Sequence, residues 1–225
     1  MVFAVVQLEP GLHLLQSYLD ADEQRRVWAM CRALADGGVP MYTPTVRGGK
    51  RMSVGMLCLG RHWNAMTYTY EAARSDFDGR PVPPLPDEFR ALAARVATSV
   101  GMTLDADICI LNYYDAGGRM GLHQDKDEGE RSLAAGLPVV SISIGDTARF
   151  LFGGTRRRAP VAQLPLHSGD AFVFGGPSRL CYHGVSRILP GTAPKDLRFS
   201  GRYNLTFRQY DAPSSANDGM TLSIT

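Results

Sequence analysis

The sequence predicts an α+β protein, mainly β, whose core is an antiparallel double sheet of the jelly-roll kind. Over residues 107–209, short apolar segments alternate with turns rich in Gly, Pro and Asp, which is typical of such folds. Two earlier segments instead repeat their apolar residues at helical spacing. A chain of 225 residues with 44% hydrophobic composition can form one substantial core. We therefore expect one domain over residues 1–210 with an elaborated entrance.

The N-terminal part of the chain predicts a strand, a surface arm and a helix. Residues 1–19 are expected to form a short strand and an arm that lies on the core. Asp20 can cap the helix that follows, and Glu23 completes a capping box with it. Gly37 and Gly38 end this helix. Its apolar face consists of Val27, Trp28, Cys31, Leu34 and Ala35.

The segment between the two predicted helices is the candidate lid. Residues 41–80 alternate short apolar stretches with Gly, Thr, Tyr and Arg, which indicates strands and loops. The proline-rich residues 81–86 predict a rigid connector into the second helix, and Gly101 ends that helix. The apolar residues at helical spacing are Phe89, Leu92, Val96 and Val100.

Two predicted strands combine core residues with polar side chains. Residues 107–114 are mostly apolar, and one face of this strand ends in Asn112 and Tyr114. Residues 202–208 alternate between an apolar face and a face of Arg, Asn, Thr and Arg. A solvated edge strand would show the same alternation, and its arginines would need only water. Further strands are predicted around Val140, Ile142 and Ile144, over residues 148–154, and over residues 171–174 after a turn at residues 167–170.

His123, Asp125 and His183 offer two imidazoles and one carboxylate, the ligand set of a non-haem iron(II) oxygenase. Residues i and i+2 of an extended segment point to one face, so His123 and Asp125 can approach one ion while a second strand delivers His183. Taken alone the triplet is a weak signal, because surface polar residues give such patterns by chance. The arginines of residues 202–208 strengthen it, since a pocket that holds a small dianion would use their planar, bidentate fork.

Five sequence blocks point further. They are Leu111-Asn112-Tyr113-Tyr114, residues 122–128 (LHQDKDE), residues 138–145 (PVVSISIG), residues 178–184 (SRLCYHG) and residues 202–209 (RYNLTFRQ). Together, and in this order from about Tyr42 to Gln209, the chain resembles the AlkB family of nucleic-acid demethylases, which are iron(II)- and 2-oxoglutarate-dependent dioxygenases. The resemblance implies a double-stranded β-helix core with N-terminal helices and a nucleotide-recognition lid at about residues 41–80.

The resemblance also implies a role for each candidate site residue. Iron(II) would be bound by His123, Asp125 and His183, with 2-oxoglutarate and O2 as cosubstrates. Arg202 would bind the distal carboxylate of 2-oxoglutarate and Arg208 the end nearer iron, with hydrogen bonds from Asn112, Tyr114 and Asn204. The substrate would be contacted by Trp63, Tyr70 and Asp127. By pattern alone, however, an aromatic such as Trp63 is more often a core residue, and Asp127 could be a solvated loop acid.

The implied reaction is oxidative demethylation of 1-methyladenine or 3-methylcytosine in DNA, with RNA left open, releasing formaldehyde, succinate and CO2. A carboxylate at Asp127 would favour these cationic rings. The chain departs from the family at two places: residues 60–63 are one residue shorter than the matching family segment, and residues 129–137 are several residues longer. Both places are expected to border the substrate entrance. Two other classes stay open: a related oxygenase that hydroxylates a substrate other than nucleic acid, and a jelly-roll binding module whose metal triad is incidental.

Charge is a mild indicator of partners. The net charge of +2 and pI of about 8.4 do not by themselves indicate nucleic-acid binding. Arg47, Lys50 and Arg51 form one basic cluster and residues 156–158 another, and each could contact phosphates or be a solvated loop.

Cysteine spacing and the chain ends bear on the compartment. The 4 cysteines form no C-x-x-C pair, which predicts neither a zinc knuckle nor a disulfide framework but buried thiols in a reducing compartment. The apolar start lacks a basic region and a spanning length, so we expect no membrane segment and a cytoplasmic location. We also expect a monomer. The polar residues 211–225 are expected to be disordered.

Overall fold

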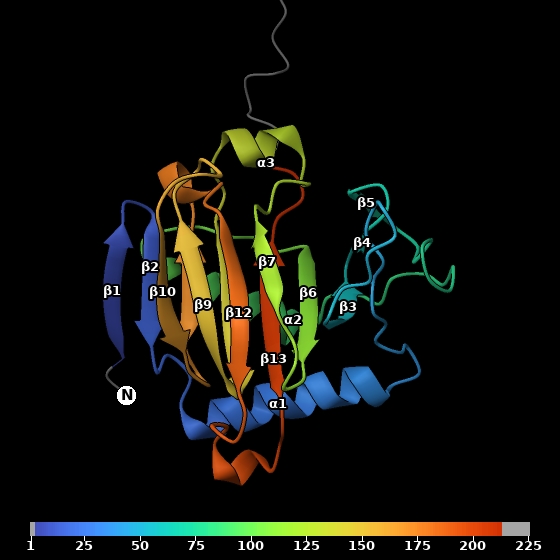
Figure 1. Cartoon of the computed structure of the whole chain (residues 1–225), viewed down its shortest axis with the longest axis horizontal. Coiled ribbons are helices and arrows are strands. Elements are labelled where there is room, and N and C mark those ends of the chain that lie inside the picture. Colours follow the sequence, from blue (N-terminus) through green and yellow to red (C-terminus); the bar gives the residue numbers. More distant parts are fainter. Residues whose placement is uncertain (1–2, 213–225) are drawn as a thin grey trace, which may run out of the picture.

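The computed structural model describes residues 3–212, which form two antiparallel sheets that face each other (Figure 1). The larger sheet has the strand order β1 (Ala4–Glu9), β2 (Leu12–Gln16), β11 (Ala171–Phe174), β8 (Val139–Gly145), β13 (Arg202–Arg208), β6 (Ile108–Tyr114), β3 (Gly55–Leu59). The smaller sheet has the order β10 (Val161–Leu166), β9 (Thr147–Gly153), β12 (His183–Leu189), β7 (Met120–His123). This is the jelly-roll arrangement that the strand pattern predicts.

Apolar side chains from both sheets fill the space between them. Phe150 of β9 packs on Phe172 of β11, with ring centroids 4.7 Å apart. Other buried members of this core are Leu12, Leu14, Val139, Ala148, Leu166, Phe174, Val185 and Ile188. Phe150 also lines the cavity described below, which therefore lies between the sheets.

Helix α1 (Ala21–Asp36) packs on the outer face of the larger sheet. Its predicted capping box is confirmed, because the Asp20 carboxylate accepts a hydrogen bond from the Glu23 N–H at 2.8 Å and Glu23 accepts one from the Asp20 N–H. Gly37 is the C-cap, and Val27 and Cys31 are buried against the sheet as the helical spacing predicts.

Helix α2 (Asp87–Thr98) covers the same face of the larger sheet, against β8 and β11. Phe89, Leu92 and Val96 are buried, as predicted. The helix ends before Val100, and Gly101 closes the turn with φ +72°, a conformation that costs glycine little. The two helices therefore form a layer that leaves the inner face of the larger sheet free for a site.

The N-terminal residues depart from the expected strand and arm. They form a hairpin of β1 and β2, and β2 pairs with β11 in register from Leu12 to Leu15. The arm prediction was wrong because the leucines of β2 are buried on both faces of the sheet: Leu14 packs between the sheets and Leu15 under the helices. A strand buried on both faces lacks the alternation that marks a half-exposed one.

The segment predicted as a lid is divided in the structure. β3 pairs with β6 at the edge of the larger sheet, so that part of residues 41–80 belongs to the core. β4 (His62–Asn64) and β5 (Thr69–Glu71) form a separate hairpin beside β3 (Figure 1). Buried His62 anchors the hairpin through Nε2, which lies 2.5 Å from Asp76 Oδ1. The part of this segment outside the core sheet thus includes a small hairpin that is fixed at its base.

Several short elements connect the strands. α3 (Glu130–Ala134) lies in the stretch that was expected to be longer than in the resembled family, and 3-10 helices span Gly176–Ser178 and Lys195–Leu197. β7, β10 and β12 were not delimited from the sequence, although a second strand carrying His183 was expected. The disorder predicted for residues 213–225 falls outside the described residues.

Within residues 3–212, no helix combines the length and the apolar character needed to cross a membrane.

Candidate functional site

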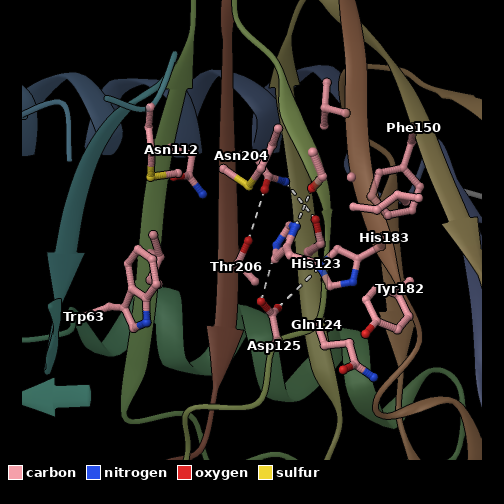
Figure 2. A pocket seen from close by; sticks show the side chains of 18 of the residues that line it. Trp63, Asn112, His123, Gln124, Asp125, Phe150, Tyr182, His183, Asn204 and Thr206 are labelled. Atoms are coloured by element: carbon pink, nitrogen blue, oxygen red, sulfur yellow. Dashed lines mark hydrogen bonds and ion pairs between the residues drawn. The ribbon is translucent and has the colours of Figure 1, made fainter. Parts of the chain in front are cut away.

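Two neighbouring strands bring the predicted metal ligands together. His123 ends β7 and pairs in register with His183, which begins β12, and the imidazole centroids lie 4.4 Å apart. Asp125 follows two residues after β7, on the same side as His123. Figure 2 shows the three side chains pointing toward one another. One ligand atom from each lies within 4.8 Å of the others, so a single ion could contact all three.

Backbone carbonyls orient both imidazoles. His123 Nδ1 lies 2.9 Å from the Gly121 carbonyl oxygen, and His183 Nδ1 lies 3.1 Å from that of Cys181. A carbonyl accepts only, so each Nδ1 donates the hydrogen bond, and a neutral ring then has its lone pair on Nε2. The Nε2 atoms of His123 and His183 each lie 3.6 Å from an Asp125 carboxylate oxygen. The two carbonyls thus orient both imidazoles toward the Asp125 carboxylate, as groups behind metal ligands do.

The ionisation of these groups also suits a cation. Burial lowers the pKa of His183 to about 4, with a further contribution from His123, so the imidazole is neutral at neutral pH. Burial alone would raise the pKa of Asp125, but Arg208 and then the two histidines outweigh it and hold that pKa well below its usual value. Neutral imidazole and ionised carboxylate are the forms that bind a divalent metal. Two His nitrogens and one carboxylate with open positions fit iron(II).

A cavity of about 520 Å³ surrounds the three residues, a volume typical of small-molecule sites. One wall is the polar face of β13 with Asn112 and Tyr114 of β6, as the strand pattern predicts. The predicted cosubstrate residues that line it are Asn112, Tyr114, Arg202, Asn204 and Arg208. The alternative of a solvated edge strand is excluded, because β13 lies between β8 and β6.

Arg202 is a buried cation that lacks a counter-ion. It is 1% exposed, and burial lowers its pKa to about 10 against the opposing effects of Tyr114 and Asp170. Its guanidinium donates to Ser143 Oγ at 2.7 Å and to the Leu166 carbonyl at 3.2 Å, while Nε has no partner. Among the described residues, no carboxylate lies within ion-pair distance of it. A buried cation in this state fits a ligand carboxylate, which is what the distal end of 2-oxoglutarate would supply.

Arg208 lies at the metal end of the same strand. Its Nη2 is 2.8 Å from Asp125 Oδ2, its Nη1 donates to the Tyr70 hydroxyl, and its Nε is 3.3 Å from Glu128 Oε1. Burial works against the charged form, but Asp125 and then Tyr70 outweigh it and raise the pKa of Arg208. Its position agrees with the predicted contact to the end of 2-oxoglutarate nearer iron.

The predicted substrate residues lie in two different places. Trp63 of β4 and Asp127 both line the cavity, and the indole Nε1 donates to Asp127 Oδ2 at 2.7 Å. Figure 2 shows Trp63 on the opposite side of the site from His183. Tyr70 does not line the cavity; it is 7% exposed, and its hydroxyl contacts Arg208 from behind the wall. Trp63 and Asp127 therefore face the space where a substrate would sit, whereas Tyr70 reaches the site only through Arg208.

The basic clusters differ in their relation to the cavity. Residues 156–158 are exposed, and Arg157 is part of the cavity lining. Arg47 lies in the loop before β3, with its guanidinium 5.4 Å from the centre of the exposed Tyr68 ring. Arg157 thus lies at the cavity itself, whereas Arg47 reaches it only through Tyr68, which lines it.

Sequence reasoning missed two buried charged residues of the site. Glu128 and Arg179 form an ion pair at 2.9 Å, and Arg179 also donates to the Asp125 backbone carbonyl at 2.5 Å. Both residues lie inside the sequence blocks that carried the family resemblance, which is the one signal that could have drawn attention to them.

Residues 11–208 match the family model described as the 2OG-Fe(II) oxygenase superfamily. The Arabidopsis thaliana protein named DNA N(6)-methyladenine demethylase ALKBH1C is 41% identical over 90% of this chain and 49% of its own length. The alpha-ketoglutarate-dependent dioxygenase AlkB of Escherichia coli K12 is 42% identical over 75% of this chain and 76% of its own.

Two further matches extend over nearly whole chains. The AlkB homolog of Caulobacter vibrioides NA1000 is 38% identical over 93% of this chain and 92% of its own. The solved structure of OsALKBH1 superposes with a TM-score of 0.86 at 40% identity, covering 92% of this chain and 100% of that one. The chain spans about half the length of the three Arabidopsis relatives that it matches.

Proposed function

Since the chain belongs to the 2OG-Fe(II) oxygenase superfamily, we propose that it is an iron(II)- and 2-oxoglutarate-dependent dioxygenase that demethylates N-alkylated bases in nucleic acid. The observation that carries the proposal is that one cavity holds both a His, His, Asp set and a buried arginine without a counter-ion. Such a cavity can take a metal at one end and a dicarboxylate between the metal and Arg202. The relatives named AlkB support the same activity.

The bound iron(II), with 2-oxoglutarate and O2, would supply the oxidation of an N-methyl group to N-hydroxymethyl, with succinate and CO2 as the other products. The side chains of the protein would place 2-oxoglutarate and the substrate relative to the metal. Arg202 holds the distal carboxylate, and Arg208 orients both Asp125 and the chelating end. The N–C bond of the N-hydroxymethyl group would then break to release formaldehyde: the ring nitrogen keeps the electron pair of that bond, and the hydroxyl proton passes to water, so the cavity needs no general-base triad.

The proposed substrates are 1-methyladenine and 3-methylcytosine in alkylated DNA, which would make the protein a direct-reversal repair enzyme. A base must leave the helical stack to reach a cavity between two sheets, and flipped bases are held by aromatic faces and read at their polar edges. Trp63 offers such a face, and Asp127 keeps one carboxylate oxygen beyond its bond to Trp63. A negative charge in the cavity favours the cationic ring of these two lesions.

A second candidate substrate is N6-methyladenine, which is neutral. It is favoured by the names of Arabidopsis relatives, which are called DNA N(6)-methyladenine demethylases. The two candidate substrates differ in ring charge, so changing the charge of Asp127 should affect them differently. Asp127→Asn should lower turnover of 3-methylcytosine more than turnover of N6-methyladenine, and parallel rates on both oligonucleotides measure that ratio.

Formaldehyde release from methylated oligonucleotides tests the proposed reaction. With iron(II), 2-oxoglutarate and air, DNA carrying 1-methyladenine or 3-methylcytosine should yield formaldehyde and succinate in equal amounts. Matched RNA strands and DNA strands that carry N6-methyladenine define the substrate range, and the unmethylated strand is the control. Succinate without formaldehyde on every strand would indicate a related oxygenase with another substrate. If no succinate forms under any condition, the protein would instead be a jelly-roll binding module without catalytic activity.

Trp63→Ala is expected to weaken binding of a methylated oligonucleotide by about 1 to 3 kcal/mol, the magnitude of one base stacked on an aromatic ring. The affinity for 2-oxoglutarate should stay near the wild-type value, because Trp63 bonds to Asp127, whereas Arg202 bonds to Ser143 and the Leu166 carbonyl. Trp28→Ala, at the other tryptophan, is the matched control and should lower the melting temperature without changing binding. A lower melting temperature for Trp63→Ala with unchanged binding would identify Trp63 as a core residue.

We also propose that the protein acts in the cytoplasm as a monomer. The four cysteines are free and buried, which supports a reducing compartment. Light scattering of the purified protein and fractionation of cells test the two statements separately.

A further inference from the structure

Glu128 is a buried carboxylate that lies next to the site without entering it. Its side chain is 0% exposed, and it follows the metal ligand Asp125 by three residues. Neither Glu128 nor its partner Arg179 belongs to the cavity lining. A buried carboxylate is costly unless it is paired, so its two arginine neighbours explain why it can stand there. Its contacts therefore indicate what it does.

Both arginine neighbours of Glu128 hold Asp125, and they do so from different sides. Arg179 donates through Nη2 to Glu128 Oε2 at 2.9 Å and through Nη1 to the Asp125 backbone carbonyl at 2.5 Å. Arg208 lies 3.3 Å from Glu128 Oε1 and 2.8 Å from Asp125 Oδ2. The contact between Arg208 and Glu128 is an ion pair rather than a hydrogen bond. One carboxylate thus orients the two guanidinium groups that fix the main chain and the side chain of Asp125.

The charges of this cluster balance without help from the cavity. Asp125 and Glu128 contribute two negative charges, and Arg179 and Arg208 two positive ones. Removing the charge of Glu128 would leave a surplus positive charge beside three groups that are placed to bind a dication. It would also remove the charged partner that orients the guanidinium groups of Arg179 and Arg208, since a guanidinium keeps its orientation only while its partners stay in place.

We infer that Glu128 is a positioning residue that sets the affinity and geometry of the metal site by holding Asp125 through Arg179 and Arg208. The inference rests on the proposed function for the identity of the metal, but its test does not depend on the organic substrate. Groups behind metal ligands typically change metal affinity about 10- to 100-fold when they are altered.

The test is cobalt(II) binding to the full chain under conditions without 2-oxoglutarate or nucleic acid. Cobalt(II) takes the same nitrogen and oxygen donors, and its visible absorption reports ligand geometry. Glu128→Gln keeps the shape and one acceptor while removing the charge. It should raise the dissociation constant about 10- to 100-fold and change the visible bands. Glu130→Gln, two residues on at an exposed carboxylate, should bind cobalt(II) as the wild type does.

Two additional variants keep the test decisive. Arg179→Lys preserves the charge but loses the simultaneous bonds to Glu128 and the Asp125 carbonyl, so it should show the same spectral change even if Glu128→Gln does not fold. The double variant Glu128→Gln/Arg179→Lys should lose little more cobalt affinity than the worse single variant, because both act through Asp125. Circular dichroism and melting curves identify the temperature at which each variant is folded.

Activity assays separate the positioning role from others. At saturating iron(II), Glu128→Gln should lower kcat on the methylated oligonucleotide and leave its KM near the wild-type value. Wild-type cobalt affinity and spectrum in folded Glu128→Gln would overturn the inference, and so would an equal loss in Glu130→Gln. A raised KM alone would make Glu128 a substrate residue and would also overturn it. If the cobalt pattern holds but no methylated strand is turned over, the positioning role stands and the proposed function fails.

Discussion

Asp125→Ala is expected to reduce succinate formation by more than about 1,000-fold, to the level of metal-free protein. Asp125 is the one carboxylate among the three converging residues, and its pKa is held low, so it supplies the negative charge that attracts a dication. Without it, two imidazoles face the cavity together with the guanidinium of Arg208. Loss of a metal that contributes several kcal/mol to the transition state corresponds to a rate loss of this size.

The fold should survive this change, although the protein should be less stable. Removing one partner of a buried ion pair leaves the other uncompensated, and Glu128 at 3.3 Å offsets this only in part for Arg208. Asp125→Asn is the milder control, because it keeps the shape and an oxygen donor. Succinate assays, cobalt titration and melting curves should be run on both variants. Turnover at the wild-type rate in Asp125→Ala would refute the assignment of the metal site.

Arg202→Lys is expected to raise the 2-oxoglutarate concentration needed for half-saturation about 10- to 100-fold. The guanidinium of Arg202 donates to Ser143 and the Leu166 carbonyl, its Nε has no partner, and the residue lines the cavity. A lysine ammonium is a point charge, so it loses the bidentate fork that a carboxylate binds best. The loss of one charge-assisted hydrogen bond, about 1.5 to 3 kcal/mol, corresponds to this change in affinity.

Arg208→Lys should have a different effect, because Arg208 contacts Asp125 as well as the cavity. We expect it chiefly to slow succinate formation at saturating 2-oxoglutarate. Anaerobic titration of 2-oxoglutarate in the presence of iron(II), followed by rate measurements, separates binding from turnover. Arg187→Lys on β12, an exposed arginine, is the matched control. Equal binding defects and equal rates in the two variants, or unchanged cosubstrate affinity in Arg202→Lys, would contradict this division.

Local patterns in the sequence were sufficient for features that depend on near neighbours. The capping box of α1 needs only Asp20 and Glu23, which are three residues apart. The alternation of β13 follows from the pleat of a strand, and it correctly divided core residues from cavity residues. Because His123 and Asp125 are two residues apart on an extended segment, their shared direction could be predicted as well. Spacing alone could not place His183 beside them, and the family resemblance supplied that expectation.

The tertiary structure decided which distant residues meet and which are left without a partner. Tyr70 was expected at the substrate, but the packing of the lid places it behind Arg208, 138 residues away along the chain. The ion pair between Glu128 and Arg179 joins residues that are 51 positions apart, and no local sequence pattern predicts it. Arg202 is exceptional because no acidic side chain in the described part of the chain lies within ion-pair distance of it. Such pairings depend on strand register and sheet packing, which combine many weak contacts over the whole fold, whereas a motif records only the residues within one turn or one pleat.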